Sequence, residues 1–389
     1  MNRKNILILL LSLLLFSCHI NKRQKAIELI QKFEQEKAID KSETVFNIAA
    51  SFNHGHLVLT GETDNQRLKS DLLSSLKNLK PADQITVLPD STVGNKIFGL
   101  INLSVANLRS APSHSAELIT QALLGTPVKI LKVKGSWYKI QTPDKYISWV
   151  DGAGIQPITQ KQFANWKLSK RVIYTADNGL IYKTNTFKVP VSDVTMGDII
   201  EETGRNYLAI KVQLPDGRTG FTKLKNWADF KNFKNNTTPD STKMKRMAEQ
   251  WNGRPYLWGG TSVRAMDCSG FVKTLFFMNG LILPRDATQQ ARYGDPVDTK
   301  TNFDEVVTGD LLFFGKKATT KSAEKITHVA LSFGGTEYMN EAGRMKMNSF
   351  NPASNIYSEY RKNSFLRAKR IIGSADAFGV LQLKNHPWY

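Results

Sequence analysis

Hydrophobic and polar residues alternate in short runs through the middle of this 389-residue chain. Within residues 98–160 the runs are separated by turns that contain Gly, Pro and Ser, a pattern typical of β-strands with one buried face. A second and looser copy of the same pattern occupies residues 168–230. The pattern therefore predicts two related β-barrels in tandem.

Helical patterns flank the two barrels. Residues 18–92 predict a small α/β domain with the order helix, hairpin, helix and strand, in which residues 46–48 of the hairpin pair with residues 56–60. Residues 231–241 are polar and rich in Asn and Thr, as in a linker. Residues 242–375 begin with a helix and continue with alternating strand patterns, and residues 376–389 are interpreted as a C-terminal tail. The predicted fold class is therefore α+β.

The first residues have the form of an export signal. A basic start, Asn2-Arg3-Lys4, is followed by an apolar run too short to span a membrane, so residues 1–17 are interpreted as a signal peptide. Residues 15–18 (LFSC) resemble a bacterial lipobox, which implies that Cys18 becomes a diacylated N-terminus and anchors the chain to a membrane of the cell envelope. His19 favours the outer over the inner membrane. The alternative is an ordinary signal peptide with a cysteine near its cleavage site.

Composition narrows the class of partner. A hydrophobic content of 41% excludes a disordered chain, and 53 Lys and Arg against 34 Asp and Glu give a formal net charge of +19. Such a charge favours an acidic partner. However, the basic residues are spread along the chain, and we find no zinc-ligand spacing, helix-turn-helix pattern or RNA-recognition motif, so no nucleic acid is expected. The oligomeric state stays unknown at this level.

One of the two cysteines lies in a context suited to catalysis. Cys268 directly precedes an amphipathic run, and a helix that begins there would favour the thiolate. The alternative is a buried cysteine that acts as a small hydrophobe, although Asp267 and Ser269 are poor packing partners for it. About 60 residues later, His328 lies in an alternating strand pattern. Together they predict a Cys-His nucleophile and base pair.

Four motifs carry a resemblance to a known family. They are RPYLWGG at 254–260, DCSGF at 267–271, GDLLFF at 309–314 and THVA at 327–330. In this order they resemble the NlpC/P60 family of cell-wall cysteine peptidases, which have a papain-like core. The tandem barrels resemble bacterial SH3 domains, and the N-terminal domain resembles the small BON-type envelope domain.

The resemblance implies an activity. Tandem SH3-like domains ahead of the peptidase are similar to the subgroup that cleaves the bond after γ-D-glutamate. The implied substrate is therefore the bond from γ-D-glutamate to diaminopimelate or lysine in peptidoglycan stem peptides, with no metal or organic cofactor.

The same resemblance assigns catalytic roles. Cys268 would be the nucleophile and His328 the general base. The third position, often histidine in the family, is Asn340, whose side-chain oxygen can orient an imidazole. A strand slipped by one residue would bring Glu341 there instead. Tyr256 resembles the tyrosine that lines the oxyanion region.

Substrate binding follows from the resemblance to the subgroup. Asp267, next to the sulfur, would pair with the free amino group of the substrate's L-Ala, so that the enzyme requires a released peptide. Ser269 flanks the sulfur on its other side. Glu117 and Tyr146 of the first barrel resemble residues that close the substrate pocket, with ordinary barrel positions as the alternative.

Two other functions stay open. A papain-like amidase or acyltransferase would use the same Cys-His pair, because the pair specifies acyl transfer without specifying the acyl group. A lipoprotein that binds the cell wall without catalysis would use the barrels and the positive charge. Asn340, in place of the usual histidine, keeps this second alternative open.

Overall fold

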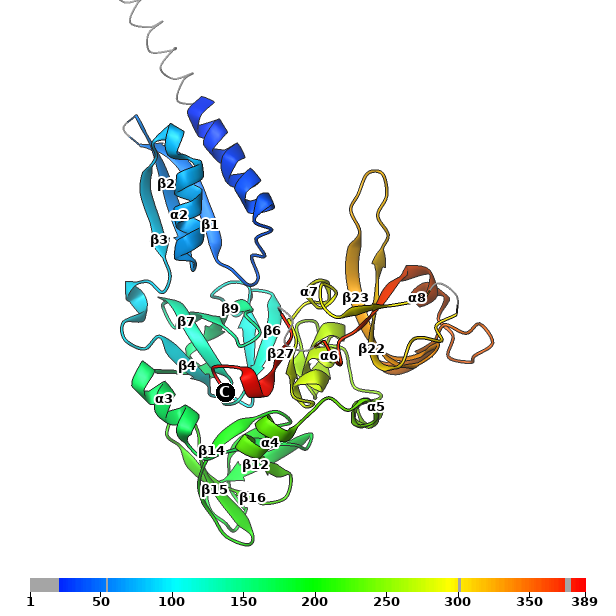
Figure 1. The fold of residues 1–389 in the computed structure, drawn as a ribbon. Helices are drawn as coiled ribbons and strands as arrows, with labels where there is room; N and C mark the ends of the chain where they lie inside the picture. Colours follow the sequence, from blue (N-terminus) through cyan, green and yellow to red (C-terminus); the bar gives the residue numbers. More distant parts are fainter. Residues whose placement is uncertain (1–20, 54, 300–301, 375–378) are drawn as a thin grey trace, which may run out of the picture. The chain divides into compact units, whose positions relative to one another are not determined.

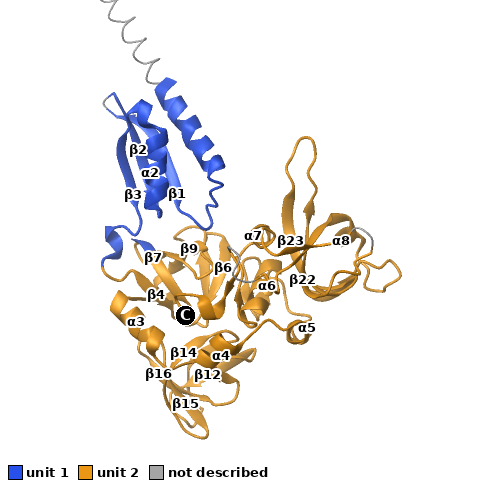
Figure 2. Cartoon of the chain, viewed as in Figure 1, with its two compact units in different colours: residues 1–94, 131–133 blue, residues 95–130, 134–389 orange. Residues whose placement is uncertain are grey.

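The structure of the chain is a computed structural model that describes residues 21–53, 55–299, 302–374 and 379–389 (Figure 1). The signal segment 1–17 and Cys18 lie outside the described residues. The contacts divide the chain into two compact units (Figure 2). Unit 1 comprises residues 1–94 and 131–133, and unit 2 comprises residues 95–130 and 134–389.

Unit 1 has the predicted order of helix, hairpin, helix and strand. Its elements are a helix at 21–36, β1 (Phe46–Asn53), β2 (His56–Thr63), α2 (Gln66–Ser75) and β3 (Ala82–Val87). The strands β1 and β2 are antiparallel, and β2 and β3 are parallel. The predicted pairing of residues 46–48 with 56–60 is wrong in register. Asn53 pairs with His56 beside the turn, so that Phe46 lies opposite Thr63.

Unit 2 begins with the first barrel, except that residues 131–133 of its strand β7 are counted with unit 1. Its strands are β4 (Phe98–Ile101), β5 (Val105–Arg109), β6 (Leu118–Leu123), β7 (Pro127–Lys134), β8 (Trp137–Gln141), β9 (Ile147–Asp151) and β10 (Ile155–Ile158). They form a sheet in the order β10-β4-β7-β8-β9-β5-β6. Helix α3 (Gln160–Leu168) follows, with a capping box at Thr159.

The second barrel repeats this topology. Its strands are β11 (Arg171–Tyr174), β12 (Asn178–Tyr182), β13 (Pro190–Thr195), β14 (Ile199–Arg205), β15 (Ala209–Gln213), β16 (Thr219–Lys223) and β17 (Trp227–Asp229). The sheet order is β13-β12-β16-β15-β14-β11-β17. If the strands of each barrel are numbered in chain order, the second sheet, read from its opposite edge, has the same strand order as the first.

Corresponding turns of the two barrels dock on each other. The N–H of Ile199 donates to the carbonyl of Leu124 at 2.9 Å, and the N–H of Leu124 donates to Asp198 at 3.1 Å. Gly125 has a φ of +73°, and a Cβ there would lie 1.9 Å from the carbonyl oxygen of Ile199. Only glycine permits this approach. The barrels are therefore joined by backbone contacts.

The segment between the second barrel and the catalytic domain is more ordered than predicted. Helix α4 (Phe230–Asn236) occupies most of the predicted linker, and its first residue is buried. Burial of that aromatic ring stabilises a helix that the polar sequence alone does not favour. Helix α5 (Ser241–Gln250) follows, with Asp240 as its N-cap.

The remaining elements form the catalytic domain. They are β18 (Thr261–Ser262), β19 (Ala265–Met266), α6 (Cys268–Phe277), β20 (Leu281–Ile282), α7 (Ala287–Gln290), β21 (Asp295–Val297), β22 (Thr308–Lys316), β23 (Lys325–Gly334), β24 (Glu337–Ala342), β25 (Arg344–Ser349), α8 (Glu359–Ser364), β26 (Phe365–Arg370) and β27 (Leu381–Gln382). Six of the strands form one sheet in the order β21-β26-β22-β23-β24-β25. The predicted α+β class is confirmed.

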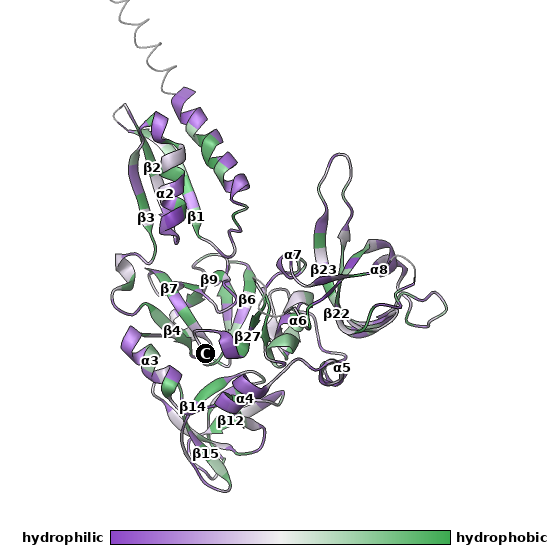
Figure 3. Cartoon of the chain, viewed as in Figure 1, coloured by the Kyte–Doolittle hydropathy of each residue, from purple (hydrophilic) through white to green (hydrophobic). Residues whose placement is uncertain are grey.

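Helix α6 is the central element of this domain. Phe271, Val272, Leu275 and Phe276 are fully buried and join a core that includes Val329 and other residues of the sheet. Figure 3 shows hydrophobic colouring on α6, whereas α5 is largely polar. Burial of a large apolar side chain stabilises the fold by about 1.5–3 kcal/mol, so this packing holds the first residue of α6 in place.

The predicted C-terminal tail is part of the fold where the structure describes it. Strand β27 pairs with β20, and Val380, Leu383 and Tyr389 are buried in the catalytic core. Within the described residues, no helix is both long and apolar enough to cross a bilayer.

Candidate active site

Cys268 is the first residue of α6 and is 7% exposed. Asp267 caps the helix, because its Oδ1 accepts a hydrogen bond from the N–H of Gly270 at 2.7 Å. A Cβ at Gly270 would lie 2.0 Å from the carbonyl oxygen of Gly260, so glycine is needed for the loop 256–260 to approach the helix. In the DCSG sequence, Asp267 thus caps the helix, Cys268 supplies the thiol, and Gly270 permits the close approach of the Gly260 carbonyl.

The ionisation of Cys268 differs from the sequence-based expectation. Burial and the negative charge of Asp267 raise the pKa of the thiol to about 11, although the backbone N–H of Val329 and the charge of Arg285 act in the opposite direction. The predicted thiolate is therefore wrong for the free protein. The thiol lies at the helix N-terminus as predicted, but the cost of burying a thiolate outweighs the helix dipole.

His328 on β23 and Asn340 on β24 are hydrogen-bonded. The distance from His328 Nε2 to Asn340 Oδ1 is 2.5 Å, and both residues are buried. Because the amide oxygen can only accept, Nε2 carries the proton and Nδ1 carries a lone pair. Asn340 Nδ2 in turn donates to Asn348 Oδ1 at 3.0 Å, which holds the amide in this orientation.

The thiol and the imidazole belong to the same small region. The backbone N–H of Val329, the residue after His328, hydrogen-bonds the sulfur of Cys268. Burial and the positive charge of Arg361 lower the pKa of His328 to about 3, although the hydrogen bond to Asn340 acts in the opposite direction. Near neutral pH both groups are therefore uncharged in the free protein, and the imidazole is ready to accept a proton from the thiol.

Asp267 forms a buried ion pair with Arg285. Arg285 Nη2 donates to Oδ2 at 2.5 Å and Nη1 to Oδ1 at 3.2 Å, and the N–H of Gly259 donates to Oδ2 at 3.0 Å. Burial alone lowers the pKa of Arg285, but Asp267 reverses the effect and holds it above its usual range. The predicted pairing of Asp267 with a substrate ammonium stays a prediction, and the carboxylate already has several donors.

Ser269 belongs to the same cluster. Its Oγ accepts from Arg285 Nη1 at 2.8 Å and donates to Asp267 Oδ1 at 3.2 Å. Arg285 Nε also donates to Thr120 of the first barrel at 2.8 Å. The sequence marks Arg285 only through its place after Leu-Pro, and its central position depends on this long-range contact.

Tyr256 lies in the loop before α6, and its backbone N–H donates to the carbonyl of Gly343 at 3.1 Å. Burial raises the pKa of its hydroxyl, and so do the charge that Cys268 carries once it ionises at alkaline pH and the charge of Asp267. The hydroxyl therefore stays protonated beside the thiol and is available as a donor.

The first barrel contacts the loops around the thiol. Trp258 Nε1 donates to Glu117 Oε1 at 2.8 Å, and Trp258 immediately precedes the glycine that binds Asp267. The hydroxyl of Tyr146 donates to Asp286 at 3.2 Å, next to Arg285. The two barrel residues singled out from the sequence thus both reach the catalytic domain.

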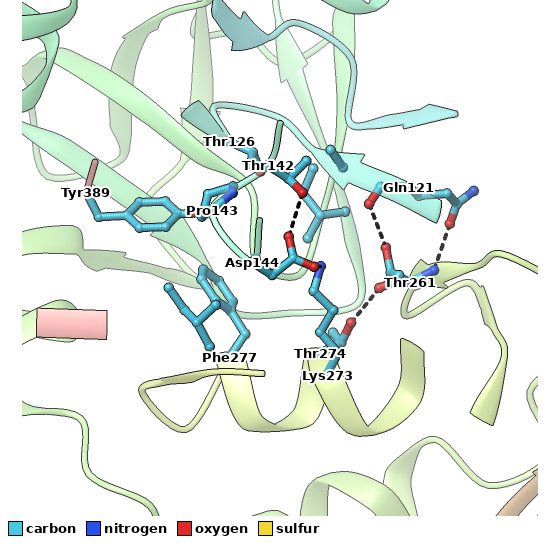
Figure 4. Close-up of a pocket in the computed structure, with 14 residues that line it drawn as sticks. Gln121, Thr126, Thr142, Pro143, Asp144, Thr261, Lys273, Thr274, Phe277 and Tyr389 are labelled. Atoms are coloured by element: carbon cyan, nitrogen blue, oxygen red, sulfur yellow. Dashed lines mark hydrogen bonds and ion pairs between the residues drawn. The ribbon is translucent and has the colours of Figure 1, made fainter. Parts of the chain in front are cut away.

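A second set of contacts holds the same barrel against α6 (Figure 4). Lys273 of α6 forms an ion pair with Asp144 at 3.0 Å, and Thr261 Oγ1 donates to the carbonyl of Gln121 at 3.1 Å. These residues line a pocket that Phe277 and Tyr389 also border. Its lining includes Lys273 and Phe277 of α6 and does not include Cys268.

Glu341 does not replace Asn340, because Asn340 makes the bond to His328. Adjacent residues of a strand face opposite sides of the sheet. Glu341 is 1% exposed, and neither carboxylate oxygen has a hydrogen-bond partner in the part of the chain that the structure describes. Burial and the nearby charge of Asp267 raise the pKa of Glu341 to about 8. Among the described residues, no group of three His, Cys, Asp or Glu is arranged to hold a metal ion.

Comparison with known proteins gives two domain matches. Residues 253–370 match the NlpC/P60 family, and residues 104–156 match the bacterial SH3 domain. A crystal structure of an NlpC/P60 family protein from Bacillus cereus has a TM-score of 0.60 and 22% identity, covering 71% of this chain and 99% of that chain. At this identity the likeness concerns the fold.

Two curated relatives extend the comparison. The Bacillus cereus γ-D-glutamyl-L-lysine dipeptidyl-peptidase is 27% identical over 230 residues, which are 57% of this chain and 66% of that protein. The Escherichia coli probable endopeptidase NlpC is 36% identical over 124 residues, which are 32% of this chain and 73% of that protein. With its cysteine at the start of α6 and its histidine on the adjoining sheet, the chain belongs to the NlpC/P60 family.

Proposed function

We propose that this chain is a cysteine peptidase that hydrolyses the amide between γ-D-glutamate and the diamino acid of peptidoglycan stem peptides. The observation that carries the proposal is the 2.5 Å bond from Asn340 to His328, beside a thiol at the start of a helix. The relative named for γ-D-glutamyl-L-lysine supports the choice of bond. The ring of His328 is held in the tautomer that a general base requires.

The reaction starts from a neutral pair. As the sulfur of Cys268 attacks the γ-carbonyl carbon, its proton passes to Nδ1 of His328. The backbone N–H of Cys268 and the hydroxyl of Tyr256 are the donors for the oxyanion. The imidazolium then gives its proton to the leaving amine, which departs and leaves a thioester. Water, deprotonated by His328, hydrolyses the thioester and restores the thiol.

The first barrel is proposed to form the wall of the site on the acyl side. Glu117 carries a carboxylate next to Trp258, at the end of the loop that reaches Asp267. A free α-ammonium on the substrate would be attracted to these acidic groups, whereas an acylated terminus would leave a charge unpaired. The preferred substrate is therefore a released peptide with free L-Ala.

The test compares the chain without residues 1–18 and its Cys268→Ala variant on L-Ala-γ-D-Glu-diaminopimelate and on the N-acetylated peptide. Mass spectrometry identifies the products. Cleavage of the free-amine peptide, lost in the variant, is the expected result. Activity that survives in Cys268→Ala would remove the proposal, and transfer of the acyl group to an added amine without hydrolysis would assign an acyltransferase instead.

The localisation rests on the sequence alone. We propose that Cys18 is lipidated and that the lipid holds the protein in the cell envelope, at the outer membrane in preference to the inner one. Metabolic labelling with a fatty acid should mark the wild-type chain and not Cys18→Ala. Labelling of both chains, or of neither, would contradict the anchor.

The chemistry of the site favours an enzyme over a wall-binding scaffold. The scaffold alternative depended on Asn340 being unable to orient the histidine. Because the Asn340 amide accepts from His328 and is itself held by Asn348, the residue performs the orienting role of the usual histidine in this geometry. If the full chain binds peptidoglycan but releases no peptide, the result would favour the wall-binding scaffold over the enzyme.

A further inference from the structure

Arg361 borders the catalytic histidine from helix α8. Its guanidinium carbon lies 5.5 Å from the ring centroid of Phe314 and 5.3 Å from that of Tyr360. The ring of Phe314 is in turn 5.6 Å from the ring of His328. The positive charge is close enough to lower the pKa of His328, and it also interacts with Cys268 and Tyr256. The guanidinium therefore lies near the reacting groups.

This cation has no counter-ion within the described residues. Its side chain is half-buried, and its contacts there are aromatic rings, with no carboxylate in hydrogen-bonding or ion-pairing distance. Two arginines on the following strand β26 do have a counter-ion, because Arg367 pairs with Glu324 and Arg370 pairs with Asp310. Burial of an unpaired guanidinium costs free energy, and an arriving carboxylate would recover it through a bidentate bond.

The position of Arg361 indicates which part of a substrate it meets. His328 must give its proton to the leaving amine, so the leaving group lies on the imidazole side of the thiol. Glu117 instead binds Trp258, in the loop whose Gly259 donates to Asp267. A group that packs against the Phe314 ring beside His328 is therefore placed for the leaving amino acid and not for the acyl portion.

We propose that Arg361 binds a carboxylate of the leaving amino acid and so selects substrates in which that residue is anionic. The inference rests on the proposed γ-D-glutamyl endopeptidase function. Lysine at this position offers its α-carboxylate, and diaminopimelate offers a second carboxylate on its side chain. Either carboxylate would serve as the counter-ion that the guanidinium lacks among the described residues.

Binding of that carboxylate also changes the base. The charge of Arg361 lowers the pKa of His328 in the free protein. A carboxylate on the guanidinium offsets this charge and raises the basicity of the imidazole. The substrate thus makes His328 a better proton acceptor at the moment when the thiol is to be deprotonated. An uncharged leaving group does not offset the charge of Arg361, so the pKa of His328 stays low.

The experiment uses the full chain, Arg361→Ala, Arg361→Lys and the control Lys362→Ala. Lys362 is exposed, on the same helix, and its ammonium lies over Phe303 and Phe350 instead of Phe314. Four substrates share L-Ala-γ-D-Glu and differ in the leaving group, which is diaminopimelate, lysine, lysine amide or aminomethylcoumarin. The quantity compared is kcat/KM for each pair of chain and substrate.

We expect Arg361→Ala to lower kcat/KM about 10-fold or more for leaving groups with a carboxylate and less than about 2-fold for the amide and the coumarin. Arg361→Lys should recover part of the loss, and Lys362→Ala should match the wild type. A loss confined to diaminopimelate assigns the side-chain carboxylate, and a loss shared with lysine assigns the α-carboxylate.

Two results would overturn the inference. One is an equal loss on all four substrates, which would assign Arg361 to the α-carboxylate of the shared γ-D-Glu or to a general electrostatic or structural role. The other is no loss on any substrate. A wild-type chain that releases neither amino acid nor coumarin would instead remove the proposed function, and the inference with it. The coumarin substrate separates these cases, because it reports acyl transfer without a carboxylate on the leaving group.

Discussion

Asn348 holds the amide of Asn340, since its Oδ1 accepts a hydrogen bond from Asn340 Nδ2 at 3.0 Å. Asn348 is itself held, because its Nδ2 donates to the carbonyl of Ile356 at 3.2 Å. An amide that could rotate would present its NH₂ group to His328 Nε2 and stabilise the wrong tautomer. The pair on β24 and β25 therefore decides which imidazole nitrogen faces the reaction.

Removal of this support should reduce turnover in graded steps. We expect Asn340→Ala to lower kcat about 10- to 100-fold, and Asn348→Ala about 3- to 10-fold, because the second change only loosens the first residue. KM should change little in both variants. Steady-state kinetics measure this, with thermal unfolding as the control for folding. A larger loss of kcat in Asn348→Ala than in Asn340→Ala, with intact folding, would contradict the proposal that Asn348 acts by holding Asn340.

The raised pKa of Cys268 predicts slow alkylation at neutral pH. With a pKa of about 11, the thiolate fraction grows tenfold for each pH unit below that value. The rate of iodoacetamide modification of Cys268, followed by mass spectrometry, should therefore rise steadily from pH 6 to pH 10. A plateau reached by pH 7 would show a thiolate-imidazolium pair in the free protein instead.

Glu341 should make stability fall as pH rises. Its pKa is raised from 4.5 to about 8 in the folded protein, so its contribution is fully present below about pH 4.5 and is lost as pH rises through about 8. Glu341→Gln removes this titration. Relative to the wild type, the variant should gain at least about 1 kcal/mol between pH 5 and pH 8.5, given about 1.4 kcal/mol per pKa unit.

Urea unfolding of both chains at the two pH values measures the Glu341 effect. The variant at pH 5 serves as its own control for packing, because the wild-type carboxyl is protonated there and resembles the amide in size. A stability difference that does not change between the two pH values would contradict the buried, titrating carboxyl.

The Asp267–Arg285 pair should be costly to break. Both side chains are buried, and removal of one leaves the other charge without compensation. We expect Arg285→Met to destabilise the protein by about 3–5 kcal/mol. The matched control is Arg264→Met, which breaks the exposed pair with Asp193 and should cost less than about 1 kcal/mol. Equal effects in the two variants, measured by denaturant unfolding, would contradict the buried pair.

Local features of this protein were predictable because short sequence segments encode them. The alternation of the barrel strands follows from the two-residue period of a strand. Asp267 caps α6 through the N–H of Gly270, three residues later in the chain. The order of the NlpC/P60 motifs identified Cys268 and His328 without any contact between them being known.

Other features depended on contacts between distant segments. The predicted linker became helix α4 because Phe230 is buried, and the predicted tail is held by the pairing of β27 with β20. Arg285 received little weight from the sequence, although it joins Asp267 to Thr120 of the first barrel. Arg285 and Thr120 are 165 positions apart in the chain, so no local sequence pattern relates them.

The sequence by itself singled out Cys268 and His328 as the proposed nucleophile and base, and it predicted the order of the elements and the position of the thiol at a helix start. Only the tertiary structure decided that burial raises the pKa of the Cys268 thiol, that Asn340 and not Glu341 hydrogen-bonds His328, and that Arg361 lies near the site with no counter-ion among the residues that the structure describes. The physical reason is that ionisation depends on desolvation and on charges brought near by folding, and neither is a property of neighbouring residues in the chain.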